Sequence, residues 1–430
     1  MIKLYDHQND ARIELMKRDS YALFLDQGTG KTLIMLYHMA YLFEHGMIES
    51  ALVVAPKSAM GAWSRDLEKI PEERSSKITN LEVVNYDIVH RRDWLVNGQF
   101  DMIVLDESHY IKNRGSKRSK ALRKMGRKAK YRYILTGTPM TNSKLHEFYA
   151  QYDFLNPSIF TNWTTFTKQF VNIGRYYQPE SYRNEDVLES IINTHAMRLT
   201  KEECLDLPEK LPDEVITVPL LEKKYYKEAM DNFIQEFDIM IDNPLVKSLR
   251  MRQIASGFLT DDGELVELKS DKLNYMQEII EGREERQTVI FAHFKHSIAS
   301  ISKRLDKMKI KHLLLNGDQK DKEIWKLFQK DDSYKVIVVQ YQTGGVGIDL
   351  FAADAIIYFE PTLSSSVNEQ SRDRIHRIGQ NRAVTYYYLL TKGTIEEKIY
   401  KTLKTGRDFS KEILRDYARE ESNGLKLEKE

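Results

Sequence analysis

The chain has 430 residues, which is too many for one ordinary hydrophobic core and predicts two or three domains. A hydrophobic content of 41% and a charged content of 30% exclude a disordered chain. The net charge is only +1, so binding to nucleic acid cannot be inferred from the overall charge. The single cysteine, Cys204, excludes a disulfide framework and a zinc site built on cysteines.

Targeting segments are not readable in the sequence. The first ten residues, MIKLYDHQND, lack the uninterrupted apolar stretch of a signal peptide. No apolar run approaches the length that spans a bilayer. Together with the single cysteine, which suits a reducing compartment, these features predict a cytoplasmic protein without membrane contact.

Short apolar runs alternate with helix-like stretches in two series along the chain. The first series is ALVVAP, LEVVNY, DMIVLDE and YRYILTGT, at residues 51–56, 81–86, 101–107 and 131–138. The second is TVIFAHF, KHLLLNG, KVIVVQY and AIIYFEP, at 288–294, 311–317, 335–341 and 355–361, followed by VTYYYLL at 384–390. Such short, β-branched, apolar runs are typical of strands buried on both faces of a parallel sheet. Two series predict two α/β lobes.

The stretch between the two series has a different character. FLNPSIFTNWTTFTKQF and KKYYKEAMDNFIQEFDIMI are rich in aromatic residues at helical spacing, and DLPEKLPDE is a proline-marked linker. We expect a first lobe at residues 1–150, a helical insertion with a linker at 151–272, a second lobe at 273–405, and a charged C-terminal helix or tail at 406–430. The expected fold class is α/β, with two parallel-sheet lobes and a helical insertion between them.

A glycine loop, DQGTGKT at residues 26–32, lies between an apolar run that ends at Leu25 and an amphipathic helix. Glycines allow the backbone N–H groups of Gly28, Thr29 and Gly30 to point at a phosphate, and the following helix adds its positive N-terminal end. Lys31 would then reach the β- and γ-phosphates of a nucleotide, and the hydroxyl of Thr32 would bind Mg²⁺. The match to the usual phosphate-loop pattern lacks its first glycine. An ordinary turn that contains a lysine is the alternative.

Two carboxylates, Asp106 and Glu107, follow the apolar run MIVL. They are expected at the carboxyl edge of a parallel sheet, where ligands bind. Asp106 would hold Mg²⁺ through water, because this ion prefers oxygen ligands and keeps part of its hydration shell. Glu107 is placed to orient and deprotonate a water molecule that attacks the γ-phosphate. A helix N-cap is the alternative, since Asp and Ser often cap after a strand.

The segment QSRDRIHRIGQ, residues 370–380, contains two arginines with helical spacing. Arg374 and Arg377 lie at i and i+3, so a helix would present both on one face. A guanidinium group beside a transferring phosphoryl group stabilises the charge that develops there. A pair of arginines on a solvated helix face is the alternative.

Several of these segments resemble the motifs of one family. DQGTGKT, DESH and LTGTP are similar to motifs I, II and III of superfamily-two helicases, and DESHYIKN followed by YRYILTGTPMTN looks like the Swi/Snf-like branch of DNA-dependent ATPases. QSRDRIHRIGQ, VVQYQTGGVGIDL, VIFAHFKHS and VVAPKSAMGAW resemble motifs VI, V, IV and Ia. The chain departs from the usual pattern at Gln27, Thr29 and Leu363; the last stands where the family usually has a tryptophan.

The resemblance implies two RecA-like lobes and assigns roles to further residues. Gln8 would read adenine, although a lone surface glutamine is the plainer explanation. Gly347 would lie at the nucleotide, and Asp349 would help to place the ribose or the arginines. The residues implied in nucleic-acid contact are Lys57, Lys112, Asn113, Thr136, Gly344 and Gly345.

The function implied by the resemblance is a compact DNA-stimulated ATPase of a phage or bacterial type. It would use ATP and Mg²⁺ to move on duplex or branched DNA, as in fork remodelling or branch migration, and would act as a monomer. The run at residues 111–130 holds ten lysines and arginines and no acid, which suits contact with the DNA backbone without sequence specificity; the alternative is a solvated helix face. Alternative functions are a strand-separating helicase on DNA or RNA, and a non-catalytic nucleic-acid-binding module.

Overall fold

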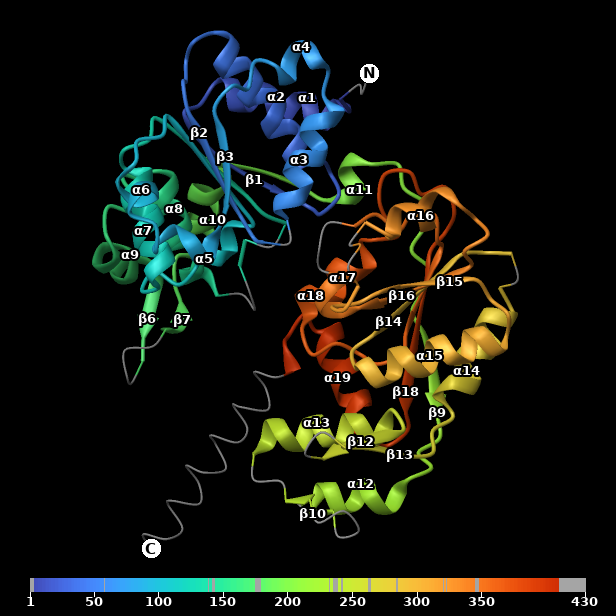
Figure 1. Ribbon diagram of the computed structural model, residues 1–430. Helices are drawn as coiled ribbons and strands as arrows, with labels where there is room; N and C mark the ends of the chain where they lie inside the picture. The colour runs from blue at the N-terminus through green and yellow to red at the C-terminus, as the bar shows by residue number, and fades with distance from the viewer. Residues whose placement is uncertain are drawn as a thin grey trace, which may run out of the picture. The chain divides into compact units, whose positions relative to one another are not determined.

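The computed structural model describes residues 4–409, apart from 58, 138, 141–143, 175–178, 232, 235–238, 241–242, 262–263, 284, 320, 322 and 345–347. The chain divides into two compact units, Met1–Asp206 and Leu207–Glu430. Each unit has its own sheet and its own hydrophobic cores (Figure 1). Among the described residues, no helix is both long enough and apolar enough to cross a bilayer.

The first unit is built on a six-stranded sheet in which every pair of neighbours is parallel. The strand order is β3-β2-β4-β5-β1-β8. Because the central strands are buried on both faces, their sequences are apolar at successive positions, as expected for a parallel sheet covered on both sides. The strands are β1 (Ser20–Leu25), β2 (Ala51–Ala55), β3 (Leu81–Asn85), β4 (Met102–Asp106), β5 (Tyr131–Leu135) and β8 (Ala196–Leu199).

Helices cover both faces of this sheet (Figure 1). One face carries α1 (Asp6–Met16), α2 (Lys31–Glu44), α3 (Met60–Lys69) and α4 (Glu72–Ser75). The other carries α5 (Tyr86–Val89), α6 (Asp93–Asn97), α7 (Lys117–Gly126), α8 (Phe148–Leu155), α9 (Trp163–Phe170) and α10 (Glu185–Thr194). The aromatic residues of α8 and α9 pack edge-on and stacked against one another, which explains their helical spacing.

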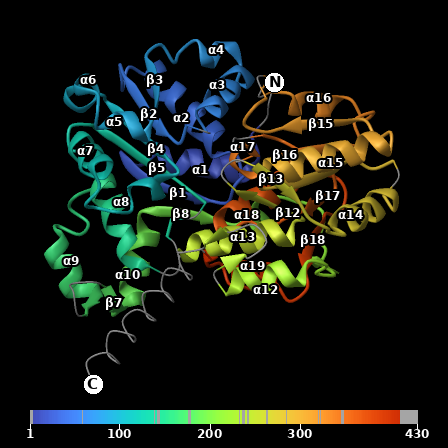
Figure 2. The same ribbon diagram turned by 60° about the horizontal axis from the view of Figure 1, so that its bottom comes forward.

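The second unit has a second six-stranded parallel sheet, in the order β15-β16-β14-β17-β18-β9. Its strands are β9 (Glu214–Val218), β14 (Thr288–Ala292), β15 (His312–Leu315), β16 (Val336–Gln340), β17 (Ala355–Tyr358) and β18 (Thr385–Thr391). The helices α14 (Lys272–Glu281) and α15 (Lys295–Lys307) cover one face (Figure 2). The other face carries α16 (Trp325–Lys330), α17 (Tyr341–Gly344) and α18 (Ser365–Arg372), and α19 (Ile395–Lys404) packs on α18.

The segment 151–272 was expected to be a helical insertion, and the structure shows strands in it as well. Its helices include α11 (Lys201–Cys204), α12 (Lys223–Met230) and α13 (Pro244–Ala255). However, β8 and β9 extend the two large sheets at their edges. The remaining strands form three hairpins: β6 (Val171–Ile173) with β7 (Pro179–Tyr182), β10 (Phe233–Ile234) with β11 (Ile239–Met240), and β12 (Phe258–Asp261) with β13 (Glu264–Glu267).

The edge strands were missed for a physical reason. An edge strand is covered less than a central one, so β8 and β9 contain exposed polar residues and do not show a continuous apolar run. Helices α12 and α13 pack with β12 and β13 around a small apolar cluster of their own. Figure 1 shows these elements together beside the second sheet. The division between the two units falls after Asp206, at the start of the proline-marked linker.

Candidate functional site

The glycine loop of the first unit joins the end of β1 to the start of α2. Gly28 and Gly30 have φ angles of 84° and 89°, in the left-handed region that glycine adopts without strain. A Cβ atom on Gly30 would also lie 2.2 Å from Nε2 of Gln8. A strand, a left-handed glycine turn and a helix N-terminus therefore stand in the order that a phosphate-binding loop requires.

Lys31 bends back over this loop. Its Nζ atom donates to the carbonyl oxygens of Leu25, at 2.7 Å, and Asp26, at 3.1 Å. The Thr29 hydroxyl also donates to the Asp26 carbonyl, at 2.8 Å. An ammonium group held over the loop in this way can exchange carbonyl oxygens for phosphate oxygens. Thr32 is the second residue of α2 and is half-buried beside Lys31.

Gln8 is buried, so the alternative explanation of a lone surface glutamine is wrong. The side chain is buried, and its Nε2 atom donates to the Thr29 carbonyl at 2.9 Å, while its Oε1 atom accepts from the backbone N–H of Tyr5 at 3.1 Å. Nε2 of His7 lies 3.0 Å from the same Thr29 carbonyl. Helix α1 therefore supports the glycine loop directly, whereas the contact of Gln8 with adenine stays a prediction.

Asp106 is the last residue of β4, and its carboxylate is buried. Its Oδ2 atom accepts from Nε1 of Trp63 at 2.9 Å, and its backbone carbonyl accepts from the Tyr86 hydroxyl at 2.8 Å. Burial, and after it the charge of Glu107, raises the pKa of Asp106 to about 6. A carboxylate whose charged form is disfavoured in this way gains most from a nearby cation.

Glu107 has a φ of 51°, a left-handed conformation that is unfavourable for a residue with a side chain. Its Oε2 atom accepts from the Thr136 hydroxyl at 3.0 Å and lies 3.2 Å from Nδ1 of His109. Burial opposes ionisation, but the hydrogen bond with His109 and the charge of Lys31 outweigh it, so the pKa of Glu107 is lowered. The carboxylate is therefore charged at neutral pH and can accept a proton.

The capping alternative for these acids does not describe the structure. The 3₁₀ helix η1 (Ser108–Ile111) follows Glu107, which makes no side-chain hydrogen bond to cap it. The Ser108 hydroxyl donates instead to Oε1 of Gln151 at 2.7 Å.

The sheet order explains how the loop, the acids and Thr136 come together. Strands β4, β5 and β1 are neighbours and run parallel, so their carboxyl ends meet at one edge. Gly137, after β5, lies against the glycine loop, because a Cβ atom there would be 3.3 Å from the Leu25 carbonyl. The structure thus gathers Lys31, Asp106 and Glu107 at the edge where ligands bind in such sheets.

The oxygen atoms of Thr32 and Asp106 suit Mg²⁺, which prefers hard oxygen ligands. The described residues contain no group of three or more His, Cys, Asp or Glu side chains that could hold a metal. An ion at this edge would therefore take most of its ligands from water and from phosphate oxygens, as Mg²⁺ commonly does.

The two arginines of the second unit do not lie on a helix, and this prediction was wrong. Helix α18 ends at Arg372, and Arg374 and Arg377 follow in turns. Gly379 has a φ of 102°, and the Gln380 side chain donates to three backbone carbonyls, of Phe351, Ala353 and Ile375. These bonds fix the end of the segment, and the Arg374 carbonyl accepts from the backbone N–H of Leu350 at 2.9 Å, so the backbone of the segment is bonded outside a helix.

Arg374 and Arg377 differ in their surroundings. Arg374 is 8% exposed, and its Nη1 atom donates to the Ile348 carbonyl at 3.5 Å. Arg377 forms an ion pair with Asp349, and both side chains remain about a quarter exposed. Asp349 therefore holds one of the two arginines, while its predicted contact with a ribose stays a prediction.

Neighbouring residues that the sequence did not single out hold the arginine segment, residues 370–380, in place. Arg372 pairs with the buried Asp213 at 2.7 Å and stacks on the ring of Tyr386. Nε2 of His376 lies 2.8 Å from the Pro208 carbonyl. Asp213 and Pro208 are distant in sequence from this segment, so no local pattern could have revealed the contacts.

Two family models match the chain in succession. The SNF2-related domain matches residues 71–278, and the helicase conserved C-terminal domain matches residues 271–379. The chain belongs to the Swi/Snf-like branch of superfamily-two helicases.

Curated relatives of this Swi/Snf-like chain come from distant organisms. An uncharacterized ATP-dependent helicase of Mycoplasma pneumoniae is 27% identical over 408 residues, which are 87% of this chain and 38% of the relative. The DNA annealing helicase and endonuclease ZRANB3 of Bos taurus is 25% identical over 437 residues, 92% of this chain and 39% of the relative. This chain thus spans less than half the length of these relatives.

A solved structure also resembles the chain. The Sulfolobus solfataricus SWI2/SNF2 ATPase core in complex with dsDNA is 25% identical and matches with a TM-score of 0.46. The match covers 94% of this chain and 91% of that one.

Most of the predicted nucleic-acid residues that the structure describes lie in turns or at the ends of elements. Lys57 is exposed in the turn after β2, and Lys112 pairs with Glu147 at 3.5 Å. Asn113 is exposed and accepts from the backbone N–H of Gly115. Gly344 ends α17, and Gly345 and Gly347 lie outside the described residues.

The basic run at residues 111–130 is not a uniformly solvated face. Arg123 and Arg127 both pair with the buried Asp153, at 2.7 and 2.9 Å. Arg114 stacks on Trp163. These three arginines contact other parts of the first unit, although Arg114 and Arg127 are also exposed. The exposed lysines of the run are Lys117, Lys120, Lys124, Lys128 and Lys130.

The Leu363 departure from the family pattern has a structural use here. Leu363 packs against the apolar cluster of Ile395, Ile399 and Leu403 in α19, and its carbonyl accepts from the backbone N–H of Phe409. The residue thus anchors the helix that follows the arginine segment.

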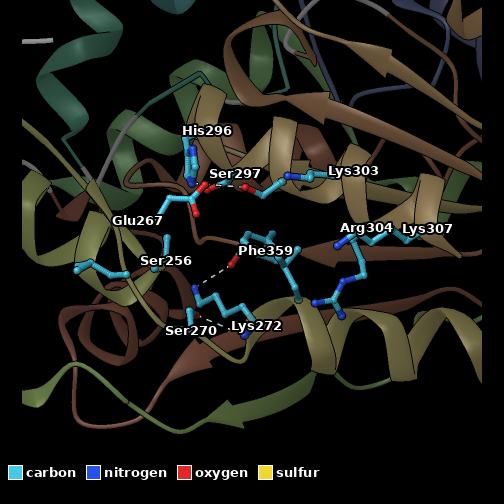
Figure 3. Close-up of a pocket in the computed structure, with 14 residues that line it drawn as sticks. Ser256, Glu267, Ser270, Lys272, His296, Ser297, Lys303, Arg304, Lys307 and Phe359 are labelled. Atoms are coloured by element: carbon cyan, nitrogen blue, oxygen red, sulfur yellow. Dashed lines mark hydrogen bonds between the residues drawn. The ribbon is translucent and has the colours of Figure 1, made fainter. Parts of the chain in front are cut away.

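A pocket of about 210 Å³ in the second unit lies away from all of these residues (Figure 3). It opens between α15, the start of α14 and the β12–β13 hairpin, and its cations include Lys303, Arg304 and Lys307. None of the predicted site residues lines it. This pocket is therefore separate from the predicted nucleotide chemistry.

Proposed function

We propose that this chain hydrolyses ATP in a DNA-stimulated manner and uses the energy to move on duplex or branched DNA. The observation that carries the proposal is the Glu107 carboxylate, which is held ionised by Thr136 and His109 at the sheet edge that also bears Lys31 and Asp106. Membership of the Swi/Snf-like branch supports the same activity.

In the proposed reaction each group of the first unit has one task. The glycine loop and Lys31 bind the β- and γ-phosphates, and Asp106 and Thr32 hold Mg²⁺ among its waters. When bound there, Mg²⁺ would supply positive charge that offsets the charge of the phosphate oxygens. Glu107 orients the attacking water and accepts its proton, which its ionised state allows.

The second unit would supply Arg374 and Arg377 to the γ-phosphate. A guanidinium group there stabilises the charge of the transition state, and its release after hydrolysis would let the two units separate again. Alternate approach and separation would then advance the protein along DNA. To reach the phosphate, Arg377 must give up its ion pair with Asp349, which is partly exposed and therefore weak.

DNA is proposed to bind through its backbone, since the sequence offers no motif for a base-reading helix. The proposed contacts are Lys57, Lys112, Asn113, Thr136, Gly344 and Gly345, together with the exposed lysines of residues 111–130. The name of a related protein, a DNA annealing helicase and endonuclease, supports DNA as the substrate. We further propose that the protein acts as a monomer in a bacterial or phage-infected cytoplasm.

ATP hydrolysis measured with a panel of nucleic acids tests the proposal. Duplex and forked DNA are expected to raise kcat, and RNA is expected to have little effect. Equal stimulation by RNA would favour the alternative RNA helicase, and unwinding of a labelled fork would favour a strand-separating helicase. Binding of DNA without any ATP turnover would support the non-catalytic module and overturn the proposal.

A further inference from the structure

The glycine loop is hydrogen-bonded to the last part of the first unit. The backbone N–H of Asp26 donates to the Leu199 carbonyl at 3.2 Å, and Oδ2 of Asp26 accepts from the backbone N–H of Lys201 at 3.1 Å. Thr200 and Glu203 form a capping box that fixes the start of α11. Asp26 therefore joins the glycine loop to residues 199–201 by two hydrogen bonds.

The arginine segment is bonded in a similar way to the first part of the second unit. His376 contacts the Pro208 carbonyl, and the backbone of Val384 exchanges hydrogen bonds with Glu209 and Leu211. Asp213 binds Arg372. These contacts lie on both sides of Arg374 and Arg377, so residues 208–213 fix the path of the segment between them.

Asp213 is the strongest of these anchors. The carboxylate is 4% exposed and accepts from Arg372 at 2.7 Å, from Lys404 at 3.0 Å and from the Tyr400 hydroxyl at 3.1 Å. Burial opposes its ionisation, but the bond with Arg372 prevails, and the pKa of Asp213 is lowered. A buried carboxylate with three donors holds its partners firmly, because leaving it unpaired is costly.

The chain between the two sets of anchors is short. Six residues, 202–207, separate Lys201 from Pro208. Helix α11 covers the first three steps at about 1.5 Å each, and the next four steps span at most about 3.6 Å each, so this part of the chain reaches at most about 19 Å. This reach sets an upper limit on how far Lys201 and Pro208 can move apart.

We propose that residues 199–213 form a tether that couples the glycine loop to the arginine segment, with Asp26 and Asp213 as positioning residues at its two ends. The proposal rests on the proposed ATPase activity and extends it. When phosphates draw the glycine loop around them, Asp26 moves residues 199–201, and the short connection transmits the movement to the segment that carries Arg374 and Arg377.

Lengthening the connection tests the tether while leaving every anchor in place. Two glycines inserted between Asp206 and Leu207, at an exposed position, keep both sets of hydrogen bonds but give the chain slack. DNA-stimulated kcat is expected to fall about tenfold, as for other small misplacements of reacting groups. KM for ATP and the unfolding temperature are expected to stay unchanged.

The matched control carries the same insertion between Arg91 and Arg92, in an exposed turn of the first unit. This control should retain the kcat of the unmodified protein. If the unmodified protein turns over ATP and the Asp206–Leu207 insertion has the same kcat as the control, the tether is refuted while the proposed function stands. If the unmodified protein lacks ATP turnover altogether, the proposed function itself fails.

A substitution at the anchor provides a second measurement. Asp213→Asn keeps the shape of the side chain and removes its charge, so kcat should fall with KM unchanged. Asp354→Asn is the control, since Asp354 is equally buried and pairs with Arg283, Arg286 and Arg382 away from the tether. Combining Asp213→Asn with the insertion should cost less than the product of the two effects, because both loosen one connection. Fully multiplicative effects would contradict a shared role.

Discussion

The glycine loop region of the first unit and the arginine segment of the second are stabilised in opposite ways. In the first unit the predicted reacting groups themselves are fixed: Lys31 by loop carbonyls, and Glu107 by Thr136 and His109. In the second unit the residues beside the predicted arginines are fixed instead: Arg372 and His376 have buried or backbone partners, whereas the ion pair of Arg377 is partly exposed. The first region is thus preorganised for chemistry, whereas the second holds a scaffold from which an arginine can change partners.

The largest effect on kcat is expected when the proposed base of the first unit, Glu107, is replaced. Glu107→Gln keeps the size of the side chain but cannot accept a proton, so kcat should fall about 10³-fold or more while ATP still binds. Steady-state hydrolysis and nucleotide binding by fluorescence measure both. Glu72→Gln, at an exposed position, is the control. A Glu107→Gln protein with normal turnover would remove this residue from the role of base.

Arg377 and Arg372 lie in the same segment but are expected to have different roles, the first in catalysis and the second in holding the segment in place. Arg377→Ala should lower kcat by about 10³-fold with little change in unfolding temperature, as for other arginines that contact a transferring phosphoryl group. Arg372→Met leaves Asp213 without its main partner and should lower the free energy of unfolding by about 3 kcal/mol. Hydrolysis assays and denaturant unfolding of both variants give the comparison. The opposite pattern would mean that the roles are exchanged.

The hydrogen bond from Thr136 to Glu107 can be tested through the pH dependence of kcat. This bond favours the ionised carboxylate, and activity requires that form, so kcat should rise with pH through the pKa of Glu107. Thr136→Val removes the donor and raises that pKa, which moves the acid limb of the pH profile to higher pH, while kcat near neutral pH changes little because His109 and Lys31 still favour the ionised carboxylate. Thr164→Val on α9 is the control. An unshifted acid limb would contradict the role of Thr136.

The smallest effect is expected at the predicted DNA contacts of the first unit. Lys57→Ala should reduce the slope of log K against log salt by about 1, because one phosphate contact is lost. Lys303→Ala, on the face of α15 that lines the separate pocket, is a matched lysine control and should leave the slope unchanged. Fluorescence anisotropy with a labelled duplex over a range of salt concentrations measures both. Equal slopes for Lys57→Ala and the unmodified protein would remove Lys57 from the DNA path.

The sequence was informative where a structural requirement is local. Central strands such as β4 and β14 need apolar residues at most positions, and a left-handed turn needs glycines such as Gly28 and Gly30, so both could be predicted. The meeting of the glycine loop with Asp106 followed from the rule that parallel strands end at one edge.

The missed features depend on contacts between distant residues. The arginine segment has helical spacing, yet the Arg374 carbonyl bonds to Leu350 and the Gln380 side chain bonds to distant carbonyls, so the helix ends at Arg372. The partners Asp213 and Pro208 lie more than 150 residues before the side chains they bind, and nothing near them in sequence indicates the pairing. Edge strands β8 and β9 were missed because their exposed residues interrupt the apolar pattern.

The central claim is that an arginine of the second unit completes the phosphate site of the first. Affinity for ADP with aluminium fluoride, which imitates the transferring phosphoryl group, measured against affinity for ADP alone by titration calorimetry, tests it most directly. The unmodified protein should bind the complex at least about 100-fold more tightly than ADP, and Arg377→Ala should lose that gain while it binds ADP normally. The same gain in Arg377→Ala and in the unmodified protein would contradict the claim.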